Sequence, residues 1–290
     1  MVKILGTGIS GLVGSRITEL LPFEFEEISW EKGIDIRDER VVKSVITSSD
    51  AEIVLHLAAK ADVDGCEKDK EKGKNGDAWQ INVVGTENIV AACRETNKKI
   101  IYISTDFVFD GNAPDGGYKE EDEPNPINWY AATKREGEKV VMNSGLPFII
   151  VRIAYPYRAE FALKKDFVRN ILSKLKDGTT IKSITDHIMT PTFIDDIACG
   201  LGKLIESNSI GIYHLVGSQF VNPYDAAVLI ANTFGLDKNL ITKTTRQEYF
   251  KGRAQRPFNL SLSNDKIQQL GVKMFKFQDG LNYLKDKINI

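Results

Sequence analysis

A glycine-rich turn directly after the first apolar segment is the feature that most restricts how this chain folds. Residues 2–6 form a short, mostly apolar segment, and Gly8, Gly11 and Gly14 follow before a segment of helical composition that ends at Pro22. Strand, glycine turn and helix in this order are the context of a dinucleotide-binding fingerprint. The glycines let the backbone approach a pyrophosphate, and the helix N-terminus attracts its charge. The turn therefore predicts a dinucleotide-binding fold.

Strands and helices are expected to alternate through the first half of the chain. The expected strands after the first are short segments at 25–30, 53–59, 100–103 and 147–153, of which the last three are mostly apolar. Segments of helical composition separate them, which is typical of a parallel sheet covered by helices on both faces. We therefore predict an α/β fold with a Rossmann-like, doubly wound parallel sheet, and a dinucleotide-binding domain over residues 1–155.

The strict alternation ends near residue 155. Further elements are expected at 161–175, 193–205, 211–216 and 223–234. The sheet is expected to be completed by about 190–216. Residues 156–189 and 217–290 are then expected to form a smaller C-terminal substrate-binding lobe, with a cleft between it and the sheet.

Composition and charge exclude several classes of function. The 38 basic and 40 acidic residues give a net charge of −2, which provides no general attraction to nucleic acid or to an anionic membrane. The longest uncharged stretch is interrupted by Ser, Asn, Gly and Pro, so no membrane span is expected. Cys66, Cys93 and Cys199 are sparse and contain no C-x-x-C pair, as in a reduced intracellular protein. The first residues lead into a strand without a signal peptide, so we expect a cytoplasmic protein. A homodimer is the candidate assembly.

Polar residues that follow the strand at 100–103 suggest a chemical site. Ser104, Thr105 and Asp106 come at its C-terminal end, where ligands bind in open α/β sheets. Tyr130 and Lys134 are four residues apart in a segment of helical composition and therefore share one helix face. A hydroxyl, a phenol and an ammonium that converge at a strand end predict proton transfer to a carbonyl or from an alcohol. Taken singly, each of these residues also fits a purely structural role.

Other polar residues leave alternatives open. Glu31 and Lys32 adjoin after the second expected strand, where an acidic residue binds the 2′-hydroxyl of NAD and a basic one accommodates the 2′-phosphate of NADP. The sequence does not choose between the two cofactors, and both charges also fit a solvated loop. His56 lies within an apolar strand, which favours a core histidine over a catalytic one. Asn82 lies within a long expected helix, at 79–96, where asparagine has low propensity.

With these residues in place, the chain resembles the extended short-chain dehydrogenases/reductases over nearly its whole length, and among them the dTDP-4-dehydrorhamnose reductases. The motifs that carry the resemblance, in order, are Gly8-x-x-Gly11-x-x-Gly14, Asp35-Ile36, His56-Leu57-Ala58-Ala59, Ser104 to Gly111, Tyr130-x-x-x-Lys134 and Arg256-Pro257. The Tyr-x-x-x-Lys spacing alone is weak evidence, whereas the whole set in order is specific. Ala131 departs from the family, which usually has Gly there, and its methyl group is expected to narrow the pocket.

The resemblance implies a role for each matching residue. Thr105, Tyr130 and Lys134 are the implied catalytic residues. The implied contacts of the cofactor, NADPH or NADH, are Gly8, Ser10, Gly11, Leu12, Val13, Gly14, Asp35, Ile36, Ala58, Ala59, Lys60, Tyr130 and Lys134. The expected substrate contacts are Thr105, Asp106, Arg253 and Arg256. The two arginines would hold a diphosphate, with Arg152 and Lys60 as weaker candidates.

The implied reaction is the NAD(P)H-dependent reduction of the 4-keto group of a nucleotide-linked 6-deoxy sugar. Phe107 follows Thr105-Asp106 at the position where the related 4,6-dehydratases have Glu. A phenyl ring cannot transfer a proton, so dehydration is disfavoured. The alternatives are another nucleotide-sugar epimerase or reductase, and a non-catalytic regulatory subunit on the same fold.

Overall fold

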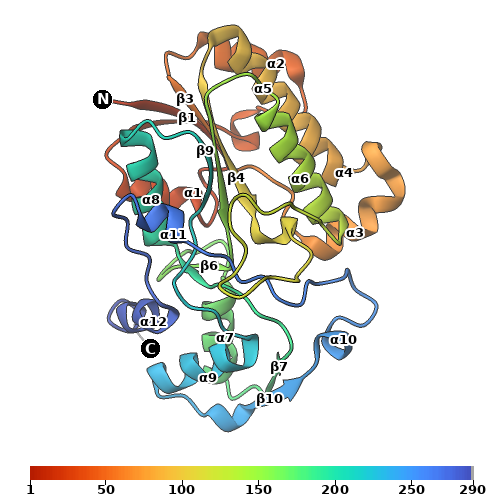
Figure 1. Cartoon of the computed structure of the whole chain (residues 1–290), viewed down its shortest axis with the longest axis vertical. Helices are drawn as coiled ribbons and strands as arrows, with labels where there is room; N and C mark the ends of the chain where they lie inside the picture. The colour runs from red at the N-terminus through yellow and green to blue at the C-terminus, as the bar shows by residue number, and fades with distance from the viewer. Residues whose placement is uncertain (289–290) are drawn as a thin grey trace.

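A computed structural model of the chain describes residues 1–288, so the last two residues of the expected lobe lie outside it. Its centre is a six-stranded parallel sheet in the order β2-β1-β3-β4-β5-β9 (Figure 1). The strands are β1 Lys3–Thr7, β2 Glu24–Ile28, β3 Ile53–His56, β4 Lys99–Thr105, β5 Phe148–Ile153 and β9 Gly211–His214. The predicted Rossmann-like α/β fold is confirmed.

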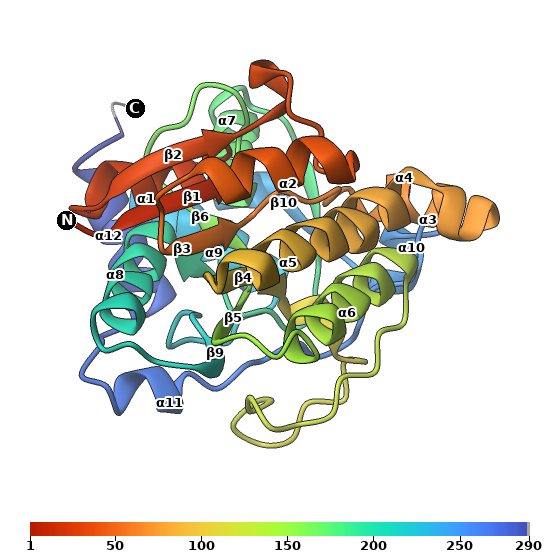
Figure 2. The ribbon, with the colours of Figure 1, turned by 90° about the horizontal axis from the view of Figure 1, so that it is seen from above.

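Helices cover both faces of the sheet (Figure 2). Consecutive strand side chains point to opposite faces, so Ile101 of β4 packs in one apolar cluster and Ile100 in the other. The first face is covered by α1 Gly14–Leu20 and α8 Ile194–Glu206. The opposite face is covered by α2 Glu39–Ser48, α5 Gly85–Thr96 and α6 Trp129–Met142. Because both faces are covered, the central strands β3 and β5 contain continuous apolar runs, whereas the edge strand β2 is only partly buried and contains three glutamates.

The order of the strands reverses at β1, since β2 lies on one side of it and β3 on the other. In such sheets the crevice outside the carboxyl ends of the strands at this point receives the ligand. Two strands end earlier than the sequence predicted, at Ile28 instead of residue 30 and at His56 instead of residue 59. The residues that follow leave the sheet at its carboxyl edge, where they line cavities.

A large part of the C-terminal half, apart from β9, α8 and α11 Asp265–Gln268, packs together beyond the carboxyl edge of the sheet, toward the bottom of Figure 1. The main elements of this part are α7 Phe167–Lys176, α9 Pro223–Phe234, α12 Phe277–Lys285 and two strand pairs, β7 Ile181–Ile184 with β10 Ile241–Thr244 and β6 Pro156–Tyr157 with β8 Thr192–Phe193. Four shorter α-helices complete the part of the chain that the structure describes. The helices α3 Val63–Asp69 and α4 Asp77–Trp79 precede α5 in the chain, and α10 Arg246–Tyr249 and α11 follow β10. Within residues 1–288, no helix has the length and hydrophobicity needed to cross a membrane.

The helix predicted at 161–175 begins later than expected. Asp166 caps its N-terminus by accepting a hydrogen bond from the backbone N–H of Arg169, so the helical conformation starts at Phe167. The Arg169 side chain also donates to the carbonyl of Phe161, which fixes the preceding residues in an irregular conformation. That the C-terminal elements form a separate substrate-binding lobe stays a prediction.

The helix predicted at 79–96 contains a π-helical turn at Gln80–Val84, between α4 and α5. Asn82 lies in this turn, buried. Its Oδ1 accepts from the backbone N–H of Lys60 at 2.8 Å, and its Nδ2 donates to the Lys60 carbonyl and to Oγ1 of Thr133. Such turns often occur at functional sites, and this one fixes the chain that follows β3.

A buried ion pair connects α6 to β5. Arg152 is 1% exposed and donates through Nε and Nη2 to the two carboxylate oxygens of Glu138, at 2.9 and 3.0 Å. The guanidinium is therefore held inside the protein and does not reach a ligand cleft. The interpretation of Arg152 as a candidate for holding the substrate diphosphate is wrong.

We expect Glu138→Gln to destabilise the protein by about 3–5 kcal/mol, because the Arg152 charge is then left buried without its partner. Urea unfolding monitored by circular dichroism measures this change. Glu136→Gln on the same helix is the matched control, since it removes an exposed ion pair with Lys139. That control is expected to change the stability by about 0–1 kcal/mol. Equal effects of the two substitutions would contradict the assigned role of the buried pair.

Candidate active site

A cavity of about 410 Å³ lies outside the carboxyl ends of β1, β3, β4 and β5. It brings together the residues predicted to be catalytic, although they come from two separate segments of the chain. The predicted residues that line it are Gly8, Gly11, Leu12, Val13, Gly14, Ala59, Thr105, Asp106, Tyr130 and Lys134. Phe107 lines it as well, whereas Ala131 is fully buried beneath and is not among the lining residues. The methyl group of Ala131 therefore does not narrow this cavity, contrary to the expectation.

Thr105 and Asp106 form a buried polar pair at the end of β4. Oγ1 of Thr105 donates to Oδ1 of Asp106 at 2.9 Å and accepts from the backbone N–H of Phe107. The second carboxylate oxygen of Asp106 is buried and has no hydrogen-bond partner within residues 1–288. Burial raises the pKa of Asp106 to about 7, because the charged form is poorly solvated there.

Tyr130 is positioned by the cap of α6. Oδ1 of Asn128 accepts from the backbone N–H of Ala131 at 2.9 Å, and its Nδ2 donates to the carbonyl of Gln255. This places Tyr130 in the first turn, with its ring edge-on to Phe107 at 6.1 Å between centroids. Burial raises the pKa of the Tyr130 phenol, and the hydroxyl of Thr105 partly offsets this effect.

Lys134 is 3% exposed and lies one helical turn after Tyr130. Its Nζ donates to the carbonyl of Ile103 at 2.8 Å and lies 4.0 Å from the centre of the Tyr102 ring. Burial lowers the pKa of Lys134 to about 7, and the carboxylate of Glu138 opposes this shift. Tyr130 and Lys134 therefore face the same cavity, with the ammonium held mainly by a carbonyl and an aromatic ring.

The glycine turn has the shape that a dinucleotide requires. Gly8 has φ +66°, and a Cβ built on it would lie 2.8 Å from the backbone N of Ala58, so only glycine fits. Gly8 and Gly11 line the main cavity and also a second one of about 340 Å³. The predicted residues that line this second cavity are Gly8, Ser10, Gly11, Asp35, Ile36, Ala58 and Ala59. Two cavities that are both lined by Gly8 and Gly11 fit an extended dinucleotide.

The predicted cationic residues lie at the edge of the site and are already paired. Arg253 contacts Asp64 at 2.5 Å, and Arg256 contacts the same carboxylate at 2.9 Å. Neither lines the main cavity. Lys60 has its backbone held by Asn82 and its Nζ 3.6 Å from Asp77. Their expected contacts with ligands stay predictions.

Sequence reasoning missed Tyr155. It lines the main cavity just after β5, with φ +41°, a conformation that non-glycine residues rarely adopt. Nδ1 of His187 lies 2.8 Å from the carbonyl of Pro257, so Nδ1 carries the proton. The Tyr155 hydroxyl therefore donates to Nε2 of His187, also at 2.8 Å. Positive φ at a residue before proline has no signal in the sequence, because that position normally favours extended backbone.

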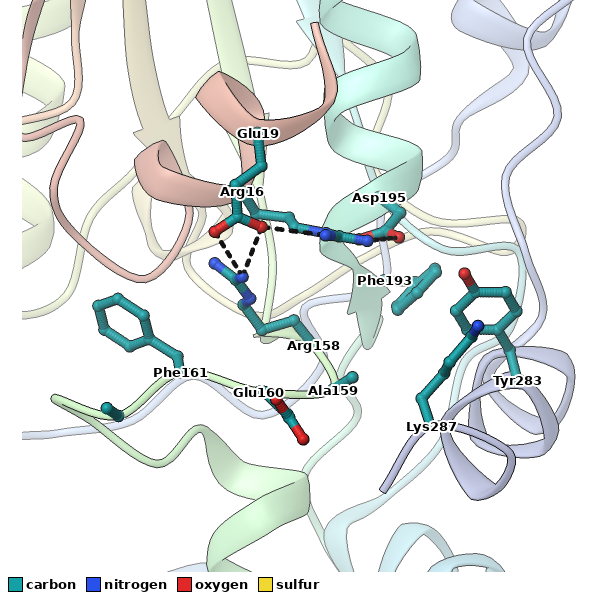
Figure 3. Close-up of a pocket in the computed structure, with 11 residues that line it drawn as sticks. Arg16, Glu19, Arg158, Ala159, Glu160, Phe161, Phe193, Asp195, Tyr283 and Lys287 are labelled. Carbon is teal, nitrogen blue, oxygen red and sulfur yellow. Dashed lines mark hydrogen bonds and ion pairs between the residues drawn. The ribbon is translucent and has the colours of Figure 1, made fainter. Parts of the chain in front are cut away.

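A larger cavity of about 620 Å³ lies elsewhere, between α1, α8 and α12, and contains none of the predicted site residues (Figure 3). Its two arginines are paired within the protein. Arg158 donates to Glu19 at 2.9 Å, and Arg16 contacts Asp195 at 2.6 Å. Size alone therefore does not identify the site, and the smaller cavity contains the groups suited to proton transfer.

A glycine turn at the reversal of a parallel sheet, followed by Thr105, Tyr130 and Lys134 around one cavity, defines an NAD(P)-dependent oxidoreductase of the extended short-chain dehydrogenase/reductase class. The resemblance inferred from the motifs is confirmed at the level of the family. The chain belongs to the RmlD substrate binding domain family, whose model matches residues 2–289.

Individual relatives have different activities. The chain is 29% identical over 294 residues to a probable low-salt glycan biosynthesis reductase of Haloferax volcanii, covering 96% of both chains. It is 28% identical to subunit beta of methionine adenosyltransferase 2 of Xenopus laevis, covering 93% of this chain and 83% of that one. The dTDP-4-dehydrorhamnose reductase of Bacillus anthracis, solved with NADP, has a TM-score of 0.88 at 28% identity, covering 98% and 99% of the two chains.

We expect Asp106→Asn to stabilise the protein more at pH 8 than at pH 4.5. The folded-state pKa of Asp106 is raised to about 7, so the folded protein binds its proton more tightly than the unfolded chain does. The stability contribution of this residue therefore falls as the pH rises from about 4 to 7, and asparagine removes that loss. Thermal unfolding at the two pH values measures the difference. A shift in Tm that does not depend on pH would contradict the prediction.

Proposed function

We propose that this protein reduces the 4-keto group of a nucleotide-linked 6-deoxy sugar with NADPH or NADH, and that dTDP-4-dehydrorhamnose is the substrate. The observation that carries the proposal is that Thr105, Tyr130 and Lys134 line one cavity that adjoins the glycine turn. The relatives named as reductases support the same reaction class. The NADP bound in the Bacillus anthracis structure supports the cofactor.

Tyr130 is the proposed proton donor. A phenol has a pKa of about 10 in water, and burial raises that of Tyr130 further, so the hydroxyl is neutral at pH 7 and can donate to a developing alkoxide. When bound, the reduced nicotinamide supplies the hydride. Lys134 would stabilise the phenolate that remains, because its ammonium is held in the same buried cavity.

Thr105 is the proposed hydrogen-bond donor to the carbonyl oxygen of the substrate. Its proton is directed to Asp106 in this structure, so donation to a substrate requires the hydroxyl to rotate. The pKa of Asp106, at about 7, lets this carboxyl accept or release a proton near neutral pH. The pair can therefore adjust its hydrogen bonds to either a ketone or an alcohol.

Phe107 favours reduction over dehydration. Its ring is 9% exposed, lines the cavity and packs edge-on against Tyr130. Elimination of water from a sugar needs an acid or base at this position in the related dehydratases, and a phenyl ring cannot supply one. Pro156 and Lys164 also line the cavity. Both lie within residues 156–189, which supports the proposal that this segment, together with residues 217–290, forms the substrate-binding lobe.

Incubation of the purified protein with NADPH or NADH and dTDP-4-dehydrorhamnose tests the function directly. We expect loss of absorbance at the nicotinamide band and formation of a 4-hydroxy product, because the site supplies both the proton donor and the cofactor cleft. A panel of dTDP-, UDP- and GDP-linked 4-keto sugars distinguishes this substrate from those of related reductases. If none of these sugars is turned over, the proposed function is rejected.

A regulatory subunit is the second candidate, because one relative is named as a subunit of methionine adenosyltransferase. Tyr130→Phe separates the two functions. If the protein is a reductase, this substitution should lower kcat by about 10²- to 10⁴-fold while cofactor binding persists, since only the acidic hydroxyl is removed. Tyr283→Phe, at a half-exposed tyrosine of α12, is the control and should retain full activity. Equal activity of the two variants would argue against Tyr130 as the proton donor.

A further inference from the structure

In the second cavity beside the glycine turn, the position directly after β2 holds a serine and not a carboxylate. In Rossmann-type folds a carboxylate shortly after the second strand binds the ribose 2′-hydroxyl, whereas an arginine near that position accommodates a 2′-phosphate. Here β2 ends at Ile28, and the residue directly after it is Ser29. Ser29 is 9% exposed and lines the cavity, and its hydroxyl has no hydrogen-bond partner within residues 1–288. A buried hydroxyl without a partner is a group that a ligand can satisfy.

Arg37 lines the same cavity, and its guanidinium is held by neighbouring side chains. Its Nε and Nη2 donate to the carboxylate of Asp35 at 2.8–3.0 Å. Its guanidinium carbon lies 5.6 Å from the centre of the Trp30 ring, which is 66% exposed. Nη1 has only a long contact of 3.5 Å, with Asp77. The guanidinium is therefore anchored on one edge and stacked on one face, with the Nη1 edge available for an anion.

Two carboxylates in this cavity oppose a phosphate, and their positions differ. Both oxygens of Asp35 accept hydrogen bonds from Arg37, including one from its backbone N–H, which holds the pKa of Asp35 below its usual range. Most of the acceptor capacity of that carboxylate is therefore used by Arg37. Glu31 lines the cavity from an exposed turn, where solvent screens its charge. Ser29 directly follows β2, and Arg37 lines the same cavity. A hydroxyl and an arginine there match the arrangement that accommodates a 2′-phosphate.

We propose that Ser29 and Arg37 form a subsite for the adenosine 2′-phosphate, so that this protein binds NADPH in preference to NADH. The inference rests on the proposed dinucleotide cleft, but it does not depend on which sugar is reduced. Ser29 donates its free hydroxyl to the phosphate, and Arg37 donates from Nη1. The stacking of Arg37 on Trp30 orders the guanidinium before the ligand arrives, which reduces the entropy lost on binding.

Isothermal titration calorimetry without any sugar substrate tests the subsite. The probes are NADPH and NADH, together with adenosine 2′,5′-bisphosphate and adenosine 5′-monophosphate, which differ only in the 2′-phosphate. We expect the phosphorylated member of each pair to bind roughly 10- to 100-fold more tightly. Arg37→Ala should remove most of this preference while leaving NADH affinity within about threefold. Arg40→Ala is the charge-matched control, since Arg40 is an exposed arginine of the adjacent surface, and it should keep the preference.

Ser29→Asp is the second variant, because it places a carboxylate directly after β2. It should weaken NADPH binding by about tenfold or more and strengthen NADH binding, which reverses the preference. Circular dichroism melting of each variant shows whether the fold is intact. Equal affinity of the unmodified protein for both members of each pair, or an unchanged preference in folded Arg37→Ala, would overturn the proposal. Failure to turn over a 4-keto sugar would reject the proposed reaction and leave this measurement unaffected.

Discussion

The close approach of the Gly8 turn to the end of β3 is the constraint on which the site depends. Oγ1 of Thr7 accepts from the backbone N–H of Ala58 at 3.1 Å and lies 2.7 Å from Nδ1 of His56. His56 reaches Thr86 of α5 through its other ring nitrogen, so one histidine connects β1, β3 and a covering helix. Burial lowers its pKa to about 3, and the ring stays neutral and structural, as the sequence favoured. These hydrogen bonds hold the ends of β1 and β3 in place, and the two cavities that Gly8 lines lie at these strand ends.

Much of this architecture could be predicted from local sequence patterns. The glycine spacing, the apolar strands and the Tyr130–Lys134 spacing each reflect an interaction between residues close in the chain. Asn82 could be predicted only in part. Its low helix propensity marked it as unusual, but only the fold shows that it holds Lys60 and Thr133. A residue that breaks a local rule can therefore indicate a tertiary contact without identifying the partner.

The remaining features depend on distant residues and had no local signal. Arg152 could not be distinguished from a ligand-binding arginine until Glu138, on a different element, was found beside it. Tyr155 has a positive φ, and its hydroxyl contacts His187, thirty-two positions away in the sequence. The residues after β2 gave ambiguous charges in sequence. The structure shows that Ser29 directly follows β2 and that Arg37, eight positions further on, lines the same cavity.

Burial, more than ion pairing, sets the protonation of the active site. The three groups Asp106, Tyr130 and Lys134 all have pKa values shifted toward their neutral forms, and burial is the largest cause each time. Glu138 cannot fully compensate Lys134, because both its oxygens are bonded to Arg152. Asp106 and Lys134 consequently both have a pKa of about 7, so a proton enters or leaves this cavity near neutral pH with little change in free energy. A carbonyl reduction that takes up one proton is well matched to a site of this kind.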